Sequence, residues 1–433
     1  MKNREPNEEQ EAGGFDGLGI APKLLDALKG SGFKNPTPIQ AQAIPVCIEG
    51  RDIVGIAQTG TGKTMAFSVP MLQRIAREGG QGLVVLPTRE LALQVDEELV
   101  KIAKRFGLRT SVLIGGASMN RQVDELRRRP HVIIVTPGRL IDHLQRRTAS
   151  LDGVRVVVLD EADRMFDMGF APQIRRIMQS VPEERQTMLF SATMPDEIAR
   201  LAQQYMHDPE RIEVARAGTA SDLVEQQLFV VPKQDKMRLL RHALKEERGT
   251  VLVFSRTKFG AKRITRELCR DGEKADEIHS NRTLAQRRSA LSGFKKGKHR
   301  VLVATDIAAR GIDVTGISLV VNYDLPEQAE DYVHRIGRTG RAERTGRAVS
   351  FAEPDQGQIV TEIELLTQKR LDMRPLPFEP SVPLQPMTSP SRRRSRGGGR
   401  SSGGAPGRRM RRPSAGPSAQ SAGQRGPARR RRY

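Results

Sequence analysis

Three carboxylates directly follow an apolar run in the first half of the chain. Residues 156–159 are apolar and lead into Asp160, Glu161 and Asp163. Such a run predicts a buried parallel strand, whose C-terminal end opens at the ligand crevice of an α/β sheet. At that edge Asp160 can hold Mg²⁺, partly through water, and Glu161 can polarise an attacking water. Alternatively, the carboxylates only cap the N-terminus of a helix, where negative charge is favourable. That interpretation predicts no phosphate-binding loop elsewhere in the chain.

A phosphate-binding loop lies far upstream, at residues 57–64. It follows a predicted strand at 52–56 and precedes a helical run that begins at Met65. Glycines 60 and 62 let successive backbone N–H groups turn toward phosphate oxygens. The loop residues that we assign to the nucleotide are Gln58, Thr59, Gly60, Thr61, Gly62, Lys63 and Thr64. Lys63 reaches the β- and γ-phosphates and the Thr64 hydroxyl can ligate Mg²⁺, although Ala57 stands where this pattern usually has its first glycine. Together the loop and the acidic strand predict nucleotide hydrolysis.

The bulk composition predicts a cytoplasmic protein. The two cysteines, Cys47 and Cys269, are too few for a disulfide framework and lack metal-ligand spacing. No apolar run approaches the length of a membrane span, and the polar, acidic N-terminus does not resemble a signal peptide.

The positive charge is concentrated at the C-terminus. The formal net charge is +21, and residues 381–433 hold 14 Arg with no Lys, Asp or Glu, so 21 minus 14 leaves +7 for the rest. A polyanionic partner is indicated, with nucleic acid favoured over membrane because no amphipathic stripe accompanies the arginines. The alternative is that the tail only keeps the protein soluble.

Alternating strand and helix patterns predict two α/β domains, each a parallel sheet covered by helices on both faces. We expect a disordered leader at 1–14, a first domain at 15–214, a linker at 215–222, a second domain at 223–372 and a disordered basic tail at 373–433. The tail is rich in Arg, Gly, Ser and Pro and has too few apolar residues to order itself. Predicted strands are 52–56, 83–86, 111–114, 132–136, 154–159 and 187–190, then 227–231, 251–254, 275–279, 301–304, 319–322 and 348–351. The halves show no sequence self-similarity, so any kinship between them is architectural.

An ordered set of short motifs over about residues 15–351 resembles the DEAD-box ATP-dependent RNA helicases, and most closely their bacterial RhlE-type branch. The motifs are residues 32–40, 57–64, 87–92, 115–116, 136–139, 160–163 and 191–193, then 253–257, 304–313 and 334–341. The resemblance implies two tandem RecA-like domains, ATP and Mg²⁺ as cofactors, and RNA as the partner.

The same resemblance assigns further residues to the nucleotide. The Gln40 amide suits an adenine edge, and Phe33 offers a face for stacking, although Phe33 alone could equally be a core residue. Asp313 is implied to contact the ribose. Arg338 and Arg341, from the second domain, would act as arginine fingers, which contribute about 10³–10⁵ in rate. The coupling residues would be Asp163, Ser191, Thr193 and His334.

The RNA-contact residues are also implied by the resemblance. They are Arg89, Gly115, Gly116, Thr136, Gly138, Arg139, Arg256, Arg287, Thr305 and Arg310. Most are small or basic, as close approach to a sugar-phosphate backbone requires. No aromatic ladder or base-reading fork is visible, so we expect sequence-independent binding of single-stranded or duplex RNA. In one departure from the family pattern, Leu284 replaces a glutamine three residues before Arg287, and whether Gln286 substitutes for it is open.

These observations predict RNA-stimulated ATP hydrolysis that closes and reopens two domains and unwinds RNA duplexes locally. The catalytic residues would be Glu161, Lys63, Arg338 and Arg341. Two alternatives are a DNA-directed translocase and an RNA-binding clamp or annealing chaperone that acts mainly through its basic tail. We expect a monomer, no membrane association, and ribosomal or RNA-decay assemblies as possible settings.

Overall fold

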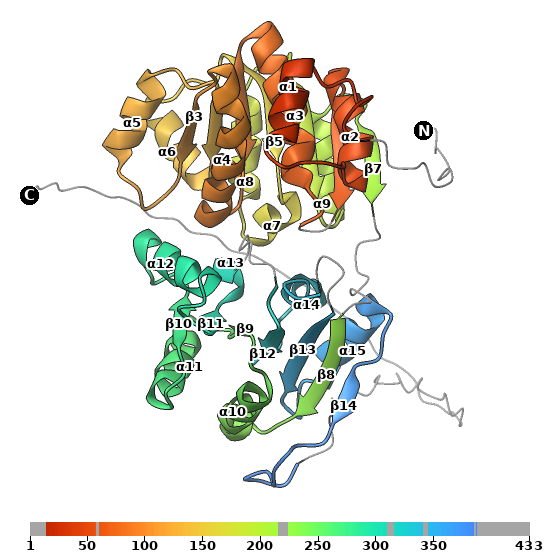
Figure 1. Ribbon diagram of the computed structural model, residues 1–433, viewed down its shortest axis with the longest axis vertical. Coiled ribbons are helices and arrows are strands. Elements are labelled where there is room, and N and C mark those ends of the chain that lie inside the picture. Colours follow the sequence, from red (N-terminus) through yellow and green to blue (C-terminus); the bar gives the residue numbers. More distant parts are fainter. Residues whose placement is uncertain are drawn as a thin grey trace, which may run out of the picture. The chain divides into compact units, whose positions relative to one another are not determined.

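The computed structural model describes residues 14–57, 60–214, 224–309, 316–340, 345–384 and 387 (Figure 1). Several expectations lie outside these residues: nearly all of the leader, the linker at 215–222 and the tail beyond Met387. Five predicted site residues also lie outside them, namely Gln58, Thr59, Arg310, Asp313 and Arg341.

The first lobe, residues 14–214, contains a parallel sheet of seven described strands in the order β3-β4-β2-β5-β6-β1-β7. The strands are β1 (Ile53–Ala57), β2 (Gln81–Val85), β3 (Thr110–Leu113), β4 (Val132–Val135), β5 (Val154–Leu159), β6 (Gln186–Ser191) and β7 (Glu210–Val214). The helices are α1 (Pro22–Lys29), α2 (Pro38–Ile48), α3 (Lys63–Glu78), α4 (Arg89–Ala103), α5 (Met119–Arg127), α6 (Pro137–Gln145), α7 (Ala162–Asp167), α8 (Ala171–Ser180) and α9 (Asp196–Tyr205), with a 3₁₀ turn η1 (Lys104–Phe106).

The second lobe, residues 224–384, contains another parallel sheet of seven described strands in the order β10-β11-β9-β12-β13-β8-β14. The strands are β8 (Val224–Val230), β9 (Val251–Phe254), β10 (Ala275–Ile278), β11 (Val301–Ala304), β12 (Leu319–Asn322), β13 (Gly346–Ala352) and β14 (Asp372–Arg374). The helices are α10 (Lys236–Glu246), α11 (Lys258–Arg270), α12 (Leu284–Lys295), α13 (Asp306–Ala309), α14 (Ala329–Ile336) and α15 (Gly357–Thr367), with a 3₁₀ turn η2 (Lys233–Asp235).

The two sheets have the same strand order. Taken in chain order, β8 to β14 occupy the places that β1 to β7 hold in the first lobe. The two halves are therefore related in architecture, and each described strand of one lobe has an equivalent in the other. Strand β8 corresponds to β1, β12 to β5 and β13 to β6.

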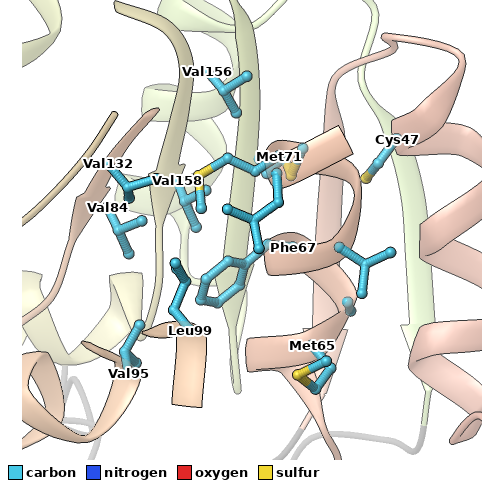
Figure 2. Packing of buried hydrophobic residues seen from close by; sticks show 14 of the residues in the cluster. Cys47, Met65, Phe67, Met71, Val84, Val95, Leu99, Val132, Val156 and Val158 are labelled. Carbon is cyan, nitrogen blue, oxygen red and sulfur yellow. The ribbon is translucent and has the colours of Figure 1, made fainter. Parts of the chain in front are cut away.

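Alternating side chains build a core on both faces of each sheet, as a strand period of two requires. On β5, Val156 and Val158 pack with α3 and α4, whereas Val157 and Leu159 face the opposite cluster. Figure 2 shows the first of these clusters, in which Phe67 of α3 lies among valines of the sheet. The second lobe repeats this arrangement on its own two faces. Both lobes are therefore parallel sheets covered on two sides, as predicted.

Two edge strands were not predicted from the sequence. Three of the five residues of strand β7 are charged, and all three residues of β14 are exposed, so neither strand presents an apolar run. The expectation that regular structure ends at Met373 is wrong at this point, because β14 spans that boundary and pairs with β8. Leu376 and Phe378 then pack against the second lobe, and the Ser381 N–H donates to Asp235 Oδ2 at 2.8 Å. Prolines do not prevent this, since an extended edge segment needs few backbone donors.

Candidate functional site

The phosphate-binding loop connects the end of β1 to the start of α3. Gly60 and Gly62 have φ values of 90° and 93°, a backbone conformation that favours glycine. Lys63 is the first residue of α3, is 6% exposed, and donates from Nζ to the Ala57 carbonyl at 2.8 Å. A buried ammonium beside the N-terminus of a 16-residue helix is an arrangement that favours an anion.

Gln40 of α2 bridges the preceding turn and the phosphate loop. Its Oε1 accepts from the Thr37 N–H at 3.0 Å, and its Nε2 donates to the Gly62 carbonyl at 3.0 Å. A Cβ on Gly62 would lie 2.3 Å from this Nε2, so the close approach requires glycine. An amide has two N–H groups and two oxygen lone pairs, so Gln40 keeps one of each for a ligand. Phe33 is partly buried against the core, which fits both roles considered for it.

Asp160 directly follows β5 and is buried at the carboxyl edge of the sheet. Its Oδ1 accepts the Glu161 N–H at 2.9 Å. Burial raises the pKa of Asp160 to about 6, and the positive charge of Lys63 acts in the opposite direction. A buried carboxylate whose charge is this poorly compensated would be stabilised by a cation.

Glu161 adopts an uncommon backbone conformation and is already paired. Its φ is 53°, a left-handed conformation at the N-cap of α7 that carries strain of about 1–3 kcal/mol. Its Oε2 accepts from Arg164 Nη1 at 2.7 Å, with the two side chains 4% and 1% exposed. Arg164 was not among the residues predicted from the sequence, because a lone arginine on a short helix gives no signal of burial.

Asp163 joins α7 to the segment after β6. Its Oδ2 accepts from the N–H groups of Ala192 and Thr193 at 3.1 and 2.9 Å and from the Thr193 hydroxyl at 3.0 Å. The Asp163 N–H in turn donates to Ser191 Oγ at 3.2 Å. Burial acts to raise the pKa of Asp163, but several opposing interactions, with the charges of Lys63 and Arg164 foremost, leave that pKa below its usual value. The structure therefore brings together three of the four predicted coupling residues.

The RNA-contact candidates of the first lobe lie close to one another. The Arg89 guanidinium packs over Gly115 and Gly116, where added Cβ atoms would lie 3.0 and 2.3 Å from its nitrogens. Arg139 donates from Nη1 to the Ala117 carbonyl at 3.1 Å. Thr136 is the N-cap of α6, and Gly138 in the first turn of that helix faces open space.

In the second lobe, the predicted site residues are distributed over the ends of several strands and one helix. Arg256 is exposed just beyond β9, and Thr305 separates β11 from α13. His334 belongs to α14, and Arg338 follows that helix. Within α14, Arg335 is buried and forms a two-pronged ion pair with Asp306, at 2.6 and 2.7 Å. This pair fixes the helix that carries His334.

Arg287 lies on α12, whose first residue is Leu284. Gln286 forms the capping box of this helix: its Oε1 accepts the Thr283 N–H at 3.0 Å, and its own N–H donates to Thr283 Oγ1 at 3.2 Å. The Gln286 amide oxygen therefore serves the helix terminus, which argues against its substituting for the glutamine that Leu284 replaces.

A buried cluster of charges in the second lobe was also missed. Lys236, the first residue of α10, is 1% exposed and contacts Asp324 at 3.1 Å and Glu353 at 2.8 Å. Asp324 also accepts from the Arg256 N–H at 3.0 Å. Burial acts to raise the pKa of Asp324, but Lys236 and this N–H outweigh it and hold that pKa below its usual value. The three charges are far apart in sequence, so no local pattern could reveal them.

Comparison with known proteins supports the resemblance seen in the motifs. The model of the DEAD/DEAH box helicase family matches residues 37–201, and that of the helicase conserved C-terminal domain matches residues 235–343. The chain is 44% identical to the ATP-dependent RNA helicase CshA of Listeria monocytogenes over 365 residues, which is 84% of this chain and 70% of the relative.

Two solved structures are also similar. S. cerevisiae Dbp5 bound to RNA and ADP BeF3 is 31% identical, with a TM-score of 0.77 over 84% of this chain and 96% of its own. Mss116p bound to ssRNA and AMP-PNP is 27% identical, with a TM-score of 0.79 over 87% and 82%.

The fold and site therefore define a protein with two RecA-like lobes and a phosphate-binding loop in the first. The chain belongs to the DEAD-box family of ATP-dependent RNA helicases. The matches support the helicase interpretation and not the clamp or annealing alternative, and they do not address the RhlE-type assignment. Among the described residues, none of the helices has the length and apolar character to cross a bilayer.

Proposed function

We propose that this chain hydrolyses ATP in its first lobe when RNA is bound, and that the cycle separates short stretches of RNA duplex. The observation that carries the proposal is the contact of Asp163 with Ala192 and Thr193. It ties the acidic edge of the phosphate site to the segment after β6. A change at the nucleotide can therefore reach a second element through charge-assisted hydrogen bonds.

The nucleotide would be held by the phosphate loop and the turn before α2. Gly60, Gly62 and the first N–H groups of α3 suit phosphate oxygens, together with Gln58 and Thr59 of the same loop. Lys63 would exchange the Ala57 carbonyl for the β- and γ-phosphates, because its ammonium is buried and a backbone carbonyl is a weaker partner than a phosphate. Phe33 and Gln40 would contact adenine, and Asp313 the ribose.

The residues at the edge of β5 fit a bound Mg²⁺. Asp160 is a buried carboxylate with a raised pKa, and Thr64 follows Lys63 on α3. The described residues hold no group of three or more His, Cys, Asp or Glu able to bind a metal, which suits an ion that arrives with the nucleotide and keeps several waters. When bound, Mg²⁺ would neutralise charge on the phosphates.

Glu161 would orient the attacking water and accept its proton. Its contact with Arg164 holds the carboxylate in one direction, so the base is positioned before substrate arrives. Arg338 and Arg341 of the second lobe would stabilise charge on the transferring phosphoryl group when the lobes close. His334 would link the second lobe to Asp163.

RNA would bind both lobes through the basic and small residues. In the first lobe these are Arg89, Gly115, Gly116, Thr136, Gly138 and Arg139, and in the second Arg256, Arg287, Thr305 and Arg310. The arginine-rich tail would tether structured RNA near the lobes by phosphate contacts. We place this activity in a cytoplasmic monomer, with ribosomal or RNA-decay assemblies as its settings.

The deciding experiment measures ATP turnover with and without RNA for the parent and for Glu161→Gln. We expect RNA to stimulate the parent, and the variant to bind ATP and RNA but turn over at least 100-fold more slowly, since general bases contribute about 10²–10⁴. Parent-like turnover by Glu161→Gln would remove Glu161 from its assigned role. Stimulation by DNA as strong as by RNA would point instead to a DNA-directed translocase.

A further inference from the structure

Phe259 is a large apolar side chain that the second lobe leaves uncovered. It is the second residue of α11 and is 71% exposed. The buried face of α11 consists of Ala261, Ile264, Thr265 and Leu268, so Phe259 belongs to the opposite side of the helix. A single exposed apolar residue is common on protein surfaces and needs no explanation by itself. What distinguishes Phe259 is its surroundings.

Basic side chains surround Phe259. Lys258 places its Nζ over the ring at 5.4 Å from the centroid. Lys262 and Arg263, three and four residues further on, share the same helix face and are exposed, as is Arg256 just before the helix. The nearest acidic residue along α11 is Glu267, two turns away, and it lies 3.8 Å from Arg241. Among the described residues, Asp324, beyond β12, is the one carboxylate that contacts these basic residues, through the Arg256 N–H, so the patch around the ring has a net positive charge.

The backbone beneath this patch is held firmly. Thr257 caps α11, its Oγ1 accepting the Gly260 N–H at 2.9 Å. The Arg256 N–H donates to Asp324, which Lys236 also contacts. A Cβ on Gly260 would lie 2.5 Å from Ser255 Oγ, so this turn packs closely against the end of β9. Phe259 thus projects from a rigid turn at the carboxyl edge of the sheet, where parallel sheets bind their ligands.

From these observations we propose that Phe259 is a stacking platform for one base of the bound RNA, and that Arg256, Lys258 and Lys262 hold the phosphates beside it. The proposal rests on the RNA binding proposed above and adds a base contact to it. An aromatic ring among cations matches a nucleotide, which offers a flat π-face and a negative phosphate a few ångströms apart. Stacking accepts every base, so the platform preserves sequence-independent binding.

The test uses the full-length chain and three variants. Phe259→Ala removes the ring, Phe259→Tyr keeps a stacking surface, and Met373→Ala removes a different exposed apolar side chain, 57% exposed on β14 at the far edge of the same sheet. The probes are a fluorescein-labelled oligouridine and its abasic counterpart, which keeps the phosphates and lacks the bases. Binding is measured over a range of salt concentrations.

We expect Phe259→Ala to weaken oligouridine binding about 5-fold or more, because stacking on one aromatic side chain contributes about 1–3 kcal/mol, or roughly 5- to 150-fold. Binding of the abasic probe and the salt slope should not change. Phe259→Tyr and Met373→Ala should bind both probes like the parent. By contrast, Lys262→Ala should reduce the salt slope by about one and weaken both probes alike.

Two results would overturn the platform. Equal affinity of Phe259→Ala and the parent for oligouridine would show that no base stacks there. Equal weakening of both probes would show that the ring only supports the phosphate contacts. Neither result touches the proposed function, which fails separately if RNA does not stimulate ATP hydrolysis by the parent.

Discussion

Lys63 in the first lobe and Lys236 in the second occupy equivalent places in the two folds. Each begins the helix that follows its sheet's equivalent strand, α3 after β1 and α10 after β8, and each is buried. Lys63 donates to a backbone carbonyl, whereas Lys236 contacts two carboxylates, Asp324 beyond β12 and Glu353 beyond β13. The second lobe therefore pairs its buried lysine directly with carboxylates, whereas Lys63 acts on Asp160 and Asp163 through its charge without a direct contact.

The carboxylates show the same contrast. Burial raises the pKa of Asp160 beyond β5, although the pKa of the nearby Asp163 is lowered, whereas Lys236 and a backbone N–H lower the pKa of Asp324 beyond the equivalent strand β12 despite its burial. A site with poorly compensated buried charges gains when a cation and phosphates enter, and a site with matched charges does not. One sheet topology thus carries the proposed nucleotide site in one lobe and a buried ion cluster in the other.

The largest effect expected from this contrast is on catalysis. Lys63→Met should reduce RNA-stimulated ATP turnover by about 10²–10³-fold, because a donor aimed at developing charge is removed from a buried site. Steady-state phosphate release at saturating RNA measures it, with circular dichroism to confirm the fold. Turnover within tenfold of the parent would contradict the assignment of Lys63.

Arg164→Met should come next, with an effect on stability and rate together. It leaves Glu161 buried without its partner, which typically destabilises a protein by about 3–5 kcal/mol. Calorimetry should show a lower unfolding temperature, and kcat should fall while KM for ATP changes little, because the base loses its orientation. Arg164→Lys keeps the charge without the planar fork and should be intermediate. Unchanged calorimetry and kcat would mean that the pair neither stabilises nor positions Glu161.

A truncation tests whether β14 and the segment after it stabilise the edge of the second sheet. A chain ending at Leu371 loses β14 and the contacts of Leu376, Phe378 and Ser381, whereas one ending at Pro390 keeps them. Since burial of one large apolar side chain contributes about 1.5–3 kcal/mol, the shorter chain should lose about 3 kcal/mol and unfold several degrees lower. The longer truncation should match the parent in calorimetry and show a shallower salt dependence of RNA binding. Equal melting of both truncations would make the segment dispensable.

Lys236→Met is the matched partner of Lys63→Met, and its expected effect is on stability alone. It leaves Asp324 and Glu353 without their common cation, although both are about one quarter exposed, so we expect a loss of about 2–3 kcal/mol. Affinity for ATP, measured by fluorescent-nucleotide competition, should remain that of the parent. A weakened ATP affinity would contradict the assignment of a purely structural role to Lys236.

The smallest effect is a pH dependence in the second lobe. The pKa of Asp324 is lowered, so its ionised form stabilises the fold above the ordinary carboxyl pKa of about 4, and this contribution disappears as the pH falls through the lowered value. Asp324→Asn should therefore lower the unfolding temperature at pH 7, and the difference from the parent should shrink below about pH 4. A difference independent of pH would assign the effect to packing rather than charge.

The sequence alone determined most of the strands and the places of the phosphate loop and the acidic strand end in the first lobe. Apolar runs such as 154–159 have the period and length of buried strands, and the residues of the phosphate loop are contiguous, so local patterns are sufficient to find them. Tertiary structure decided which buried charges meet: Arg164 with Glu161, Lys236 with Asp324 and Glu353, and Asp163 with the segment after β6. It also decided the edge strands β7 and β14, which lack an apolar pattern. The physical reason is that burial and pairing depend on residues brought together by the sheet order, and their separation along the chain leaves no periodic signal.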